Sequence, residues 1–260
     1  MSLTDQELDR YARHLVLRQI GGPGQARIRA ARVLVVGAGG LGSPCALYLA
    51  AAGVGTLGLA DDDTVSLSNL QRQILFRSGD VGRPKVAAGA AALEALNPGT
   101  AVTPHPVRLT AGNVMAVIAD YDLVTDGTDN AATRFLLGDA CFLAQKPLVS
   151  AAVTGFAGQL ATWKGWLPGC PCHRCLFAEP PEAAPDCAET GVLGAATGVM
   201  GSLQALEVLK EITGAGTGMA GRLTRFDALA GTFRTLGLPK DPACPLCGRD
   251  APIRDLSRHG

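Results

Sequence analysis

The chain has 260 residues, 47% of them hydrophobic, and is long enough to bury a sizeable core in one large domain with an appendage. Lys and Arg together number 23, as do Asp and Glu, so no net charge draws the protein to nucleic acid or to an anionic membrane. The sequence has neither a signal-peptide core nor a run of about 18 uncharged apolar residues, which predicts a cytoplasmic protein that does not span a membrane.

Residues 1–31 are predicted to form an N-terminal helical segment with two short helices between 4 and 31. Thr4 is placed as the N-cap of the first helix, and Glu7 stands three residues later, at the spacing of a capping box. Because this segment precedes the core, we expect an arm that reaches another subunit.

A nucleotide-binding α/β core is predicted for residues 32–153. It begins with an apolar strand at 32–36, the turn GAGGLG at 37–42, a helix at 43–52 and an apolar strand at 56–60. The alternation continues with a helix at 84–96, a strand at 101–108, a helix at 111–119, a strand at 122–126, a helix near 131–144 and a strand at 148–153. This order predicts a Rossmann-like, doubly wound, mostly parallel sheet.

Residues 154–260 have a different pattern, although we assign them to the same overall domain. The stretch 155–163 alternates like an antiparallel strand, and 168–191 is rich in Pro and Cys. A long helix at 192–212 and short strands at 221–227 and 231–237 lead to a tail with further cysteines. We therefore expect a C-terminal antiparallel subdomain with a crossover loop and zinc knuckles.

Three glycines, Gly37, Gly39 and Gly42, follow the first strand and open a helix. In this setting the backbone N–H groups and the helix N-terminus bind phosphate oxygens. Asp61 ends the second strand, where an acidic side chain meets a ribose hydroxyl. The motif predicts a nucleotide without saying which one, and tight strand–helix packing alone is the less specific interpretation.

Two basic residues follow this acid. Arg72 lies in the polar stretch LSNLQRQ at 67–73, and Lys85 begins a predicted helix. Fixed cationic groups stabilise the negative charge that develops when a carboxylate attacks an α-phosphate. Either residue alone would be read as solvated surface charge. Their joint position beside a nucleotide turn favours nucleotidyl transfer over a dehydrogenase.

The stretch TDGTDN at 125–130 follows the strand at 122–126, at the sheet edge where ligands bind. Asp129 could hold the Mg²⁺ that bridges ATP phosphates. Capping the next helix is the alternative role, and it suits Asp126 better than Asp129.

Two C-x-x-C pairs, Cys172 with Cys175 and Cys244 with Cys247, offer four thiolates for tetrahedral Zn²⁺. A redox dithiol is the alternative, but the pairs lie in Pro-rich, turn-like sequence. Cys170 and His173 crowd the first pair and could substitute as ligands, although each is better read as a bystander.

The remaining cysteines differ in setting. Cys187 lies in 179–191, which has no periodicity and predicts a loop, so its thiol could attack an activated acyl group or be an unreactive surface cysteine. Cys45 and Cys141 fall on predicted helices and are expected to be buried. Arg13 lies on an N-terminal helix, where periodicity assigns it no role.

The sequence combines GAGGLG, Asp61, LSNLQRQ, Lys85, TDGTDN, the paired C-x-x-C knuckles and Arg10-Tyr11-x-Arg13. This combination resembles the MoeB/ThiF family, relatives of the ubiquitin-activating enzymes. The resemblance spans Arg10 to Cys247 and is closest to the molybdopterin-synthase adenylyltransferases. It implies ATP-dependent adenylation of the C-terminal Gly-Gly carboxylate of a ubiquitin-like sulfur-carrier protein of the MoaD/ThiS type. Thiocarboxylation would follow, in molybdopterin or thiamine biosynthesis, and residues 154–260 would bind the carrier.

The resemblance also assigns residues. It implies nucleotide contacts for Gly37, Gly39, Gly40, Gly42, Asp61, Asn69, Arg72, Gln73, Lys85, Asp129 and Asn130. Catalytic roles would fall to Arg13, Arg72, Lys85, Asp129 and Cys187, and the role of Cys187 differs among family members. Asp129 would bind Mg²⁺ and the four knuckle cysteines Zn²⁺. Arg13 would enter the active site of a neighbouring subunit, which implies a homodimer.

Some features depart from the family pattern. Residues 61–63 carry an extra acid, Cys170 is additional, and no rhodanese-like domain follows residue 247, so we expect a separate protein as sulfur donor. Three alternatives remain: a tRNA-modifying dehydratase of the same superfamily, an NAD-dependent oxidoreductase, and a non-catalytic zinc scaffold. The neutral charge and the knuckles argue against the first, and Arg72, Lys85 and Asp129 against the other two.

Overall fold

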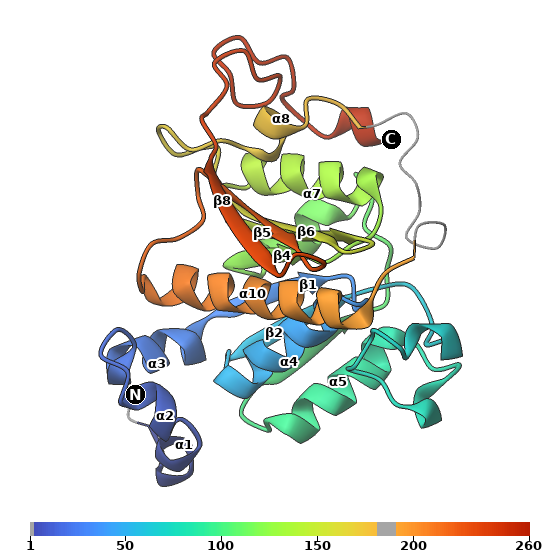
Figure 1. Ribbon diagram of the computed structural model, residues 1–260, viewed down its shortest axis with the longest axis vertical. Coiled ribbons are helices and arrows are strands. Elements are labelled where there is room, and N and C mark those ends of the chain that lie inside the picture. The colour runs from blue at the N-terminus through green and yellow to red at the C-terminus, as the bar shows by residue number, and fades with distance from the viewer. Residues whose placement is uncertain (1–2, 181–190) are drawn as a thin grey trace.

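The computed structural model describes residues 3–180 and 191–260, which are built around one eight-stranded sheet (Figure 1). The strand order is β3-β2-β1-β4-β5-β6-β7-β8. The strands are β1 (Arg32–Val36), β2 (Thr56–Ala60), β3 (Ala101–His105), β4 (Leu123–Asp126), β5 (Leu148–Thr154), β6 (Ala157–Trp163), β7 (Arg222–Asp227) and β8 (Thr232–Gly237). Neighbours from β3 to β5 pair in parallel, and those from β5 to β8 antiparallel. The predicted mostly parallel α/β sheet with an antiparallel extension is confirmed.

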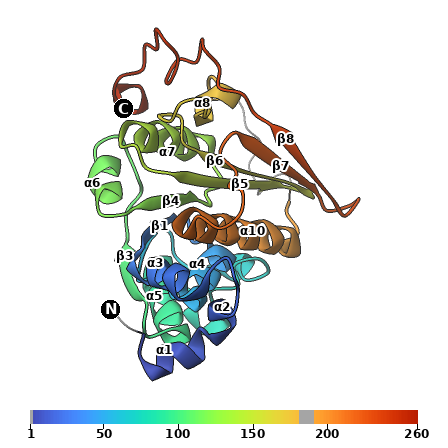
Figure 2. The ribbon, with the colours of Figure 1, turned by 90° about the vertical axis from the view of Figure 1, so that its left-hand side faces the viewer.

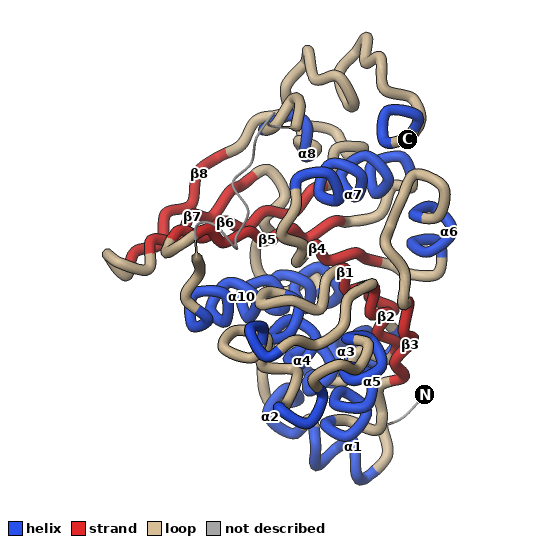
Figure 3. Tube along the Cα trace, turned by 90° about the vertical axis from the view of Figure 1, so that its right-hand side faces the viewer, coloured by secondary structure: helices blue, strands red, loops and turns tan. Residues whose placement is uncertain are grey.

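Helices cover both faces of the sheet (Figures 2 and 3). One face carries α3, α4, α5 and α10, and the opposite face carries α6, α7 and α8 (Figure 2). The helices are α1 (Asp5–Arg10), α2 (Ala12–Leu15), α3 (Gly21–Ala30), α4 (Gly42–Ala52), α5 (Lys85–Leu96), α6 (Val114–Ala119), α7 (Ala131–Leu143), α8 (His173–Leu176) and α10 (Gly194–Thr213), with short 3₁₀ turns at Leu67–Asn69, Ser78–Asp80 and Ser257–His259. Within the described part of the chain, no helix is long and apolar enough to cross a membrane.

The alternation of side chains along β1 divides the core into two layers. Val33 and Val35 belong to the cluster that packs under α4 and α10, whereas Leu34 and Val36 belong to the cluster under α6 and α7. All four are at most 4% exposed, because a central parallel strand is covered on both faces. The continuous apolar run was therefore a correct signal of a doubly covered strand.

The N-terminal segment forms three helices, so the prediction of two was wrong. Thr4 does cap α1, and Glu7 completes the capping box. The chain leaves helical geometry at Tyr11, whose ring is buried and whose hydroxyl accepts a hydrogen bond from Asn97 at 2.9 Å. Burial of this aromatic ring separates α1 from α2, a tertiary effect that local periodicity does not contain.

The predicted strand 101–108 was too long, because β3 ends at His105. The predicted helix 111–119 also starts later, at Val114. The residues between these elements form a loop, and Val107, Arg108 and Leu109 in it line a cavity at the carboxyl ends of the parallel strands. The shortened strand therefore supplies part of the site.

Candidate active site

A cavity of about 340 Å³ lies at the carboxyl ends of β1, β2 and β4. This is where open α/β sheets bind ligands. Gly37, Asp61, Arg72, Lys85 and Asp129 all line it, although they come from separate segments of the chain. The structure thus places these five predicted residues around one space.

The glycine-rich turn owes its shape to contacts that no side chain could enter. Gly37 has φ of +85°, a conformation that L residues rarely adopt. A Cβ on Gly42 would lie 1.7 Å from the carbonyl oxygen of Gly37, and one on Gly127 would lie 2.9 Å from the Gly42 nitrogen. Gly42 itself does not line the cavity, so it shapes the turn, whereas Gly37, Gly39 and Gly40 form the wall.

Asp61 ties the turns after β1 and β2 together. One carboxylate oxygen accepts from the Ala38 N–H at 2.8 Å, and the other from the Asp63 N–H at 2.9 Å. Burial raises the pKa of the Asp61 carboxyl above its ordinary value, and the Lys85 ammonium opposes this increase. Each carboxylate oxygen keeps a further lone pair, and the contact with a ribose hydroxyl remains a prediction.

The polar stretch at 67–73 contributes unequally. Arg72 lines the cavity, and its guanidinium donates to the Ser68 carbonyl at 3.2 Å. Gln73 also lines it, is 3% exposed, and has a side-chain oxygen with no partner among the described residues. Asn69 does not line the cavity, and its side-chain oxygen accepts from the Ser66 N–H. Its predicted contact with the nucleotide therefore has less support than those of Arg72 and Gln73.

The TDGTDN loop has a buried acid and an accessible one. Asp126 is fully buried and accepts from the Thr128 N–H, the Thr128 hydroxyl and the Ser150 hydroxyl. The cap of α7 is instead Asn130, which accepts from the Thr133 N–H, so the alternative of Asp126 as cap was wrong. Asp129 is exposed and lines the cavity. Its carboxylate makes no hydrogen bond or ion pair with residues 3–180 or 191–260. Its carboxylate is therefore available to a cation, as Mg²⁺ binding requires.

The structure adds residues that sequence reasoning missed. Thr197, in the first turn of α10, and Val192, just before that helix, line the same cavity, and Arg134 lines it from the first turn of α7. A signal existed for Arg134, because it lies one helical turn after Asn130 and so faces the same side. No sequence signal existed for Thr197, because it lies far along the chain from the other cavity residues and only the fold brings it to the cavity.

A second cavity of about 240 Å³ adjoins the first, and both are lined by Asp129, Arg134 and Val153. Its walls include the rings of Trp163 and His173, whose centroids lie 5.6 Å apart. Burial lowers the pKa of His173 to about 4, so this imidazole is neutral at physiological pH. The second cavity is therefore an aromatic-walled space that opens beside Asp129.

One of the predicted catalytic residues lies elsewhere, and another cannot be placed. Arg13 is exposed on α2 and lines neither cavity of its own chain. Cys187 lies outside the described residues. The roles predicted for both remain predictions.

The four knuckle cysteines meet although 72 residues separate the pairs. The Sγ atoms of Cys172 and Cys244 are 3.4 Å apart, and those of Cys175 and Cys247 are 3.3 Å apart. Sulfurs bound to one tetrahedral zinc at about 2.3 Å would be about 3.8 Å from one another, close to these separations. Neither Cys170 nor His173 belongs to the cluster, so both are bystanders. The donor set fits zinc.

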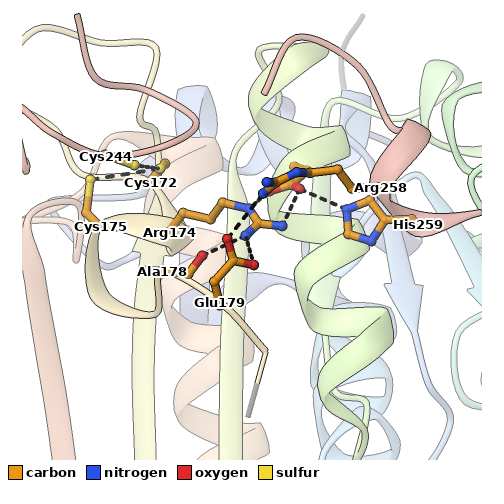
Figure 4. Close-up of polar contacts among 9 residues, drawn as sticks. Cys172, Arg174, Cys175, Ala178, Glu179, Cys244, Arg258 and His259 are labelled. Atoms are coloured by element: carbon orange, nitrogen blue, oxygen red, sulfur yellow. Dashed lines mark hydrogen bonds and ion pairs between the residues drawn. The ribbon is translucent and has the colours of Figure 1, made fainter. Parts of the chain in front are cut away.

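An ion-pair network lies beside the knuckles (Figure 4). Arg174, between the first two cysteines, makes two hydrogen bonds, of 2.7 and 2.9 Å, to the buried carboxylate of Asp139 on α7. His259 contacts the same carboxylate at 2.8 Å, and Arg258 contacts Glu179 at 3.2 Å. The tail thus contacts α7 through His259, whereas Arg258 and the two tail cysteines contact the segment around α8.

Cys45 and Cys141 are buried on α4 and α7, as predicted. Burial raises the pKa of both thiols, to about 12 for Cys45. They are therefore unreactive packing residues.

Known proteins resemble this chain over most of its length. A family model, the ThiF family, matches residues 11–246. The chain is 47% identical over 263 residues to the sulfur carrier protein adenylyltransferase of Thermus thermophilus, with 98% of this chain and 96% of that protein covered. It is 46% identical over 250 residues to the SAMP-activating enzyme E1 of Haloferax volcanii, covering 95% and 92%.

A longer relative is the adenylyltransferase and sulfurtransferase MOCS3 of Bos taurus, which is 50% identical over 258 residues. That match covers 98% of this chain and 56% of MOCS3, so the chain spans about half of this relative. Among solved structures, MccB of E. coli has a TM-score of 0.80 at 18% identity, covering 94% of this chain and 76% of that one. PaaA has a TM-score of 0.75 at 21% identity, covering 92% and 76%. These structures share the fold.

Proposed function

Because the chain belongs to the ThiF family, we propose that it is an ATP-dependent adenylyltransferase that activates the C-terminal carboxylate of a ubiquitin-like sulfur-carrier protein. Two relatives that the chain covers almost completely are named as a sulfur carrier protein adenylyltransferase and as a SAMP-activating enzyme. The carrier would be of the MoaD/ThiS type with a C-terminal Gly-Gly, serving molybdopterin or thiamine biosynthesis.

The observation that carries this proposal is the convergence of Arg72, Lys85 and Asp129 on the cavity of the glycine-rich turn. Hydride transfer to a dinucleotide needs no such set, whereas attack on a phosphate concentrates negative charge that cations stabilise. The backbone N–H groups of Gly39 and Gly40 and the start of α4 would hold phosphate oxygens, since those of Gly37 and Ala38 already donate to Ala60 and Asp61. Asp61 would hold the ribose.

The proposed reaction forms one bond and breaks one. A carboxylate oxygen of the terminal glycine attacks the α-phosphorus of ATP, and the bond from that phosphorus to the bridging oxygen of the β-phosphate breaks. Pyrophosphate leaves with the electron pair, and the acyl-adenylate remains. Arg72 and Lys85 would stabilise the charge on the transferring and leaving phosphates. Asp129 would hold Mg²⁺, which supplies charge neutralisation to the phosphates.

The second cavity offers a route for the rest of the substrate. It meets the first cavity at Asp129 and Arg134. The reacting carboxylate would lie at this junction. A Gly-Gly terminus is narrow enough to cross such a junction, since it has no side chains. The carrier segment before the terminus would then lie on the α7 side of β5 and β6.

Several finer assignments belong to the same proposal. Zn²⁺ in the cysteine cluster would staple the tail to the domain and take no part in catalysis. Arg13 would enter the cavity of a second copy in a homodimer, which accords with its exposure and with its absence from the cavity of its own chain. Cys187 would act as a nucleophile only if the reaction included a covalent link between this cysteine and the carrier. A separate protein would donate sulfur, and cytoplasmic ATP would supply the enzyme.

Exchange of labelled pyrophosphate into ATP tests the function. We expect exchange only when a carrier with an intact Gly-Gly terminus is added, because the reverse reaction needs the acyl-adenylate. The Asp129→Asn variant should lose about 100-fold or more of the exchange rate. Glu94→Gln, which makes the same change on the exposed side of α5, should retain it.

Two results would refute the proposal. One is exchange that proceeds equally without a carrier. The other is the absence of exchange with every Gly-Gly carrier tried, while the protein is folded and binds ATP.

A further inference from the structure

A buried glutamine on α10 holds the base of the loop that carries Asp129. Gln204 is 0% exposed, and its side-chain nitrogen donates to the Asp126 carbonyl at 2.8 Å and to the Val149 carbonyl at 2.9 Å. Asp126 is the last residue of β4, and Val149 lies on the neighbouring strand β5. Gln204 therefore joins two adjacent strands from the face opposite α7.

From Asp126 the contacts continue into the loop. The carboxylate of Asp126 accepts from the Thr128 N–H at 3.0 Å and from the Ser150 hydroxyl at 2.7 Å. The Thr128 carbonyl in turn accepts from the Arg134 guanidinium at 2.5 Å. Asp126 and Thr128, which flank Gly127, are thus both held by hydrogen bonds. Asp129 is the next residue after Thr128.

The energetics favour a specific role for this amide. Its oxygen is buried and has no hydrogen-bond partner in the part of the chain that the structure describes. A buried acceptor without a partner is unfavourable, because it has lost its hydrogen bonds to water. An apolar side chain of similar size would avoid this cost but would donate nothing to the two carbonyls. The two donated bonds therefore distinguish glutamine from a packing residue here.

Other contacts of α10 reach the opposite wall of the same cavity. Gly194 lies so close to Gln71 that a Cβ there would be 2.2 Å from the Gln71 carbonyl oxygen. Thr197 lies against the glycine-rich turn, 3.1 Å from a Cβ built on Gly40, and lines the cavity. One rigid helix thus touches the segment of Arg72 near its start and the loop of Asp129 through Gln204.

We propose that Gln204 is a positioning residue, which fixes the 126–130 loop and so sets Asp129 relative to Arg72 across the cavity. The inference rests on the proposed function for the role of Asp129, but the hydrogen bonds of the loop are independent of it. A displacement of about 1 Å in a catalytic group can lower a rate about 100-fold. Gln204 would thus act on the reaction without touching ATP.

The test compares Gln204→Met with Gln25→Met. Gln25 is also 0% exposed and donates to a backbone carbonyl, that of Ala52, but it lies on α3, where its side-chain oxygen contacts His14, and it does not line the cavity. Hydrogen exchange of the full-length protein without substrates should show faster exchange of the Thr128 amide in Gln204→Met only. Carrier-dependent pyrophosphate exchange should fall about 10- to 100-fold in Gln204→Met and change less than about twofold in Gln25→Met.

A double-mutant cycle separates positioning from general damage. In the Asp129→Asn background, Gln204→Met should lower the residual exchange less than about twofold, because the group that it positions has already been removed. A full additional loss in that background would overturn the proposal. Wild-type protection of Thr128 in Gln204→Met would also overturn it.

If Gln204→Met does not fold, Gln204→Glu keeps the size of the side chain and places a carboxylate against the two carbonyls. It should expose the Thr128 amide at least as strongly, and unchanged protection would contradict the inference. Failure of the proposed function is distinguishable, because the Thr128 readout uses neither carrier nor ATP. A protein with no carrier-dependent exchange but with loss of Thr128 protection would refute the function alone.

Discussion

The side-chain nitrogen of Lys85 lies 2.8 Å from a carboxylate oxygen of Asp63, and the two residues are also joined by a backbone hydrogen bond of 2.9 Å. The Lys85 side chain is 6% exposed, whereas that of Asp63 is 68% exposed. Asp61 lies 3.8 Å from the same ammonium. The acidic residues after β2 thus hold the Lys85 ammonium at the wall of the first cavity.

Replacing Lys85 by Met should lower carrier-dependent pyrophosphate exchange by about 100-fold or more, because the cation that faces the phosphates is lost. Lys210→Met is the matched control, since Lys210 pairs with Glu207 on α10 and does not line the cavity. Rates at saturating ATP and carrier give the comparison. Equal rates in the two variants would exclude a catalytic role for Lys85.

Two alanine substitutions in the glycine-rich turn should separate folding from binding. Gly42→Ala forces a Cβ within 1.7 Å of the Gly37 oxygen and should lower Tm by about 10 °C or more. Gly39→Ala meets only the Gln73 side chain, at 3.8 Å, so Tm should change little while the added methyl group weakens ATP binding. Thermal unfolding and calorimetric titration with ATP measure the two effects. Equal loss of Tm in both variants would contradict this assignment.

The buried carboxyl of Asp61 predicts a pH-dependent difference in stability. Its pKa is raised above 3.8 by burial, so the folded state binds this proton more tightly than the unfolded state. The site therefore opposes folding when it is ionised, and this cost disappears as pH falls through the raised pKa. Asp61→Asn removes the cost at neutral pH, so its stability relative to wild type should decrease as pH is lowered from about 7 to about 4.

Urea denaturation of both proteins across this range measures the difference. Asp122→Asn serves as control, because Asp122 is an exposed carboxylate that accepts from the Arg32 N–H. A relative stability of Asp61→Asn that increases on acidification would show that Asp61 has a depressed pKa instead.

The cysteine cluster predicts a metal-dependent contribution to stability. Cys244→Ser should abolish bound zinc and lower the free energy of unfolding by at least about 2 kcal/mol, because the tail loses its link to Cys172 and Cys175. Cys170→Ser changes a nearby cysteine outside the cluster and should retain both metal and stability. Metal analysis of the purified proteins and their unfolding curves test this. Full zinc content in Cys244→Ser would refute the four-cysteine site.

Local sequence pattern determined the features that depend on neighbouring residues. The apolar runs of β1 and β2, the glycine-rich turn between them and Asp61 at the next strand end follow from rules that act within about thirty residues. The capping of α1 by Thr4 was correct for the same reason. Where a long-range contact competed with the pattern, as at Tyr11, the predicted element was wrong.

Tertiary structure alone decided how distant segments share the site. The two cysteine pairs could be named from their spacing, but only the fold brings Cys244 to 3.4 Å from Cys172. Thr197, Arg134 and Gln204 gave no signal as strong, because their roles depend on where α7 and α10 pack against the sheet. Packing is set by the whole core and not by any window of sequence. The sequence by itself therefore determined which reactive residue types are present and in what order, and the packing of α10 and the tail decided which of them meet.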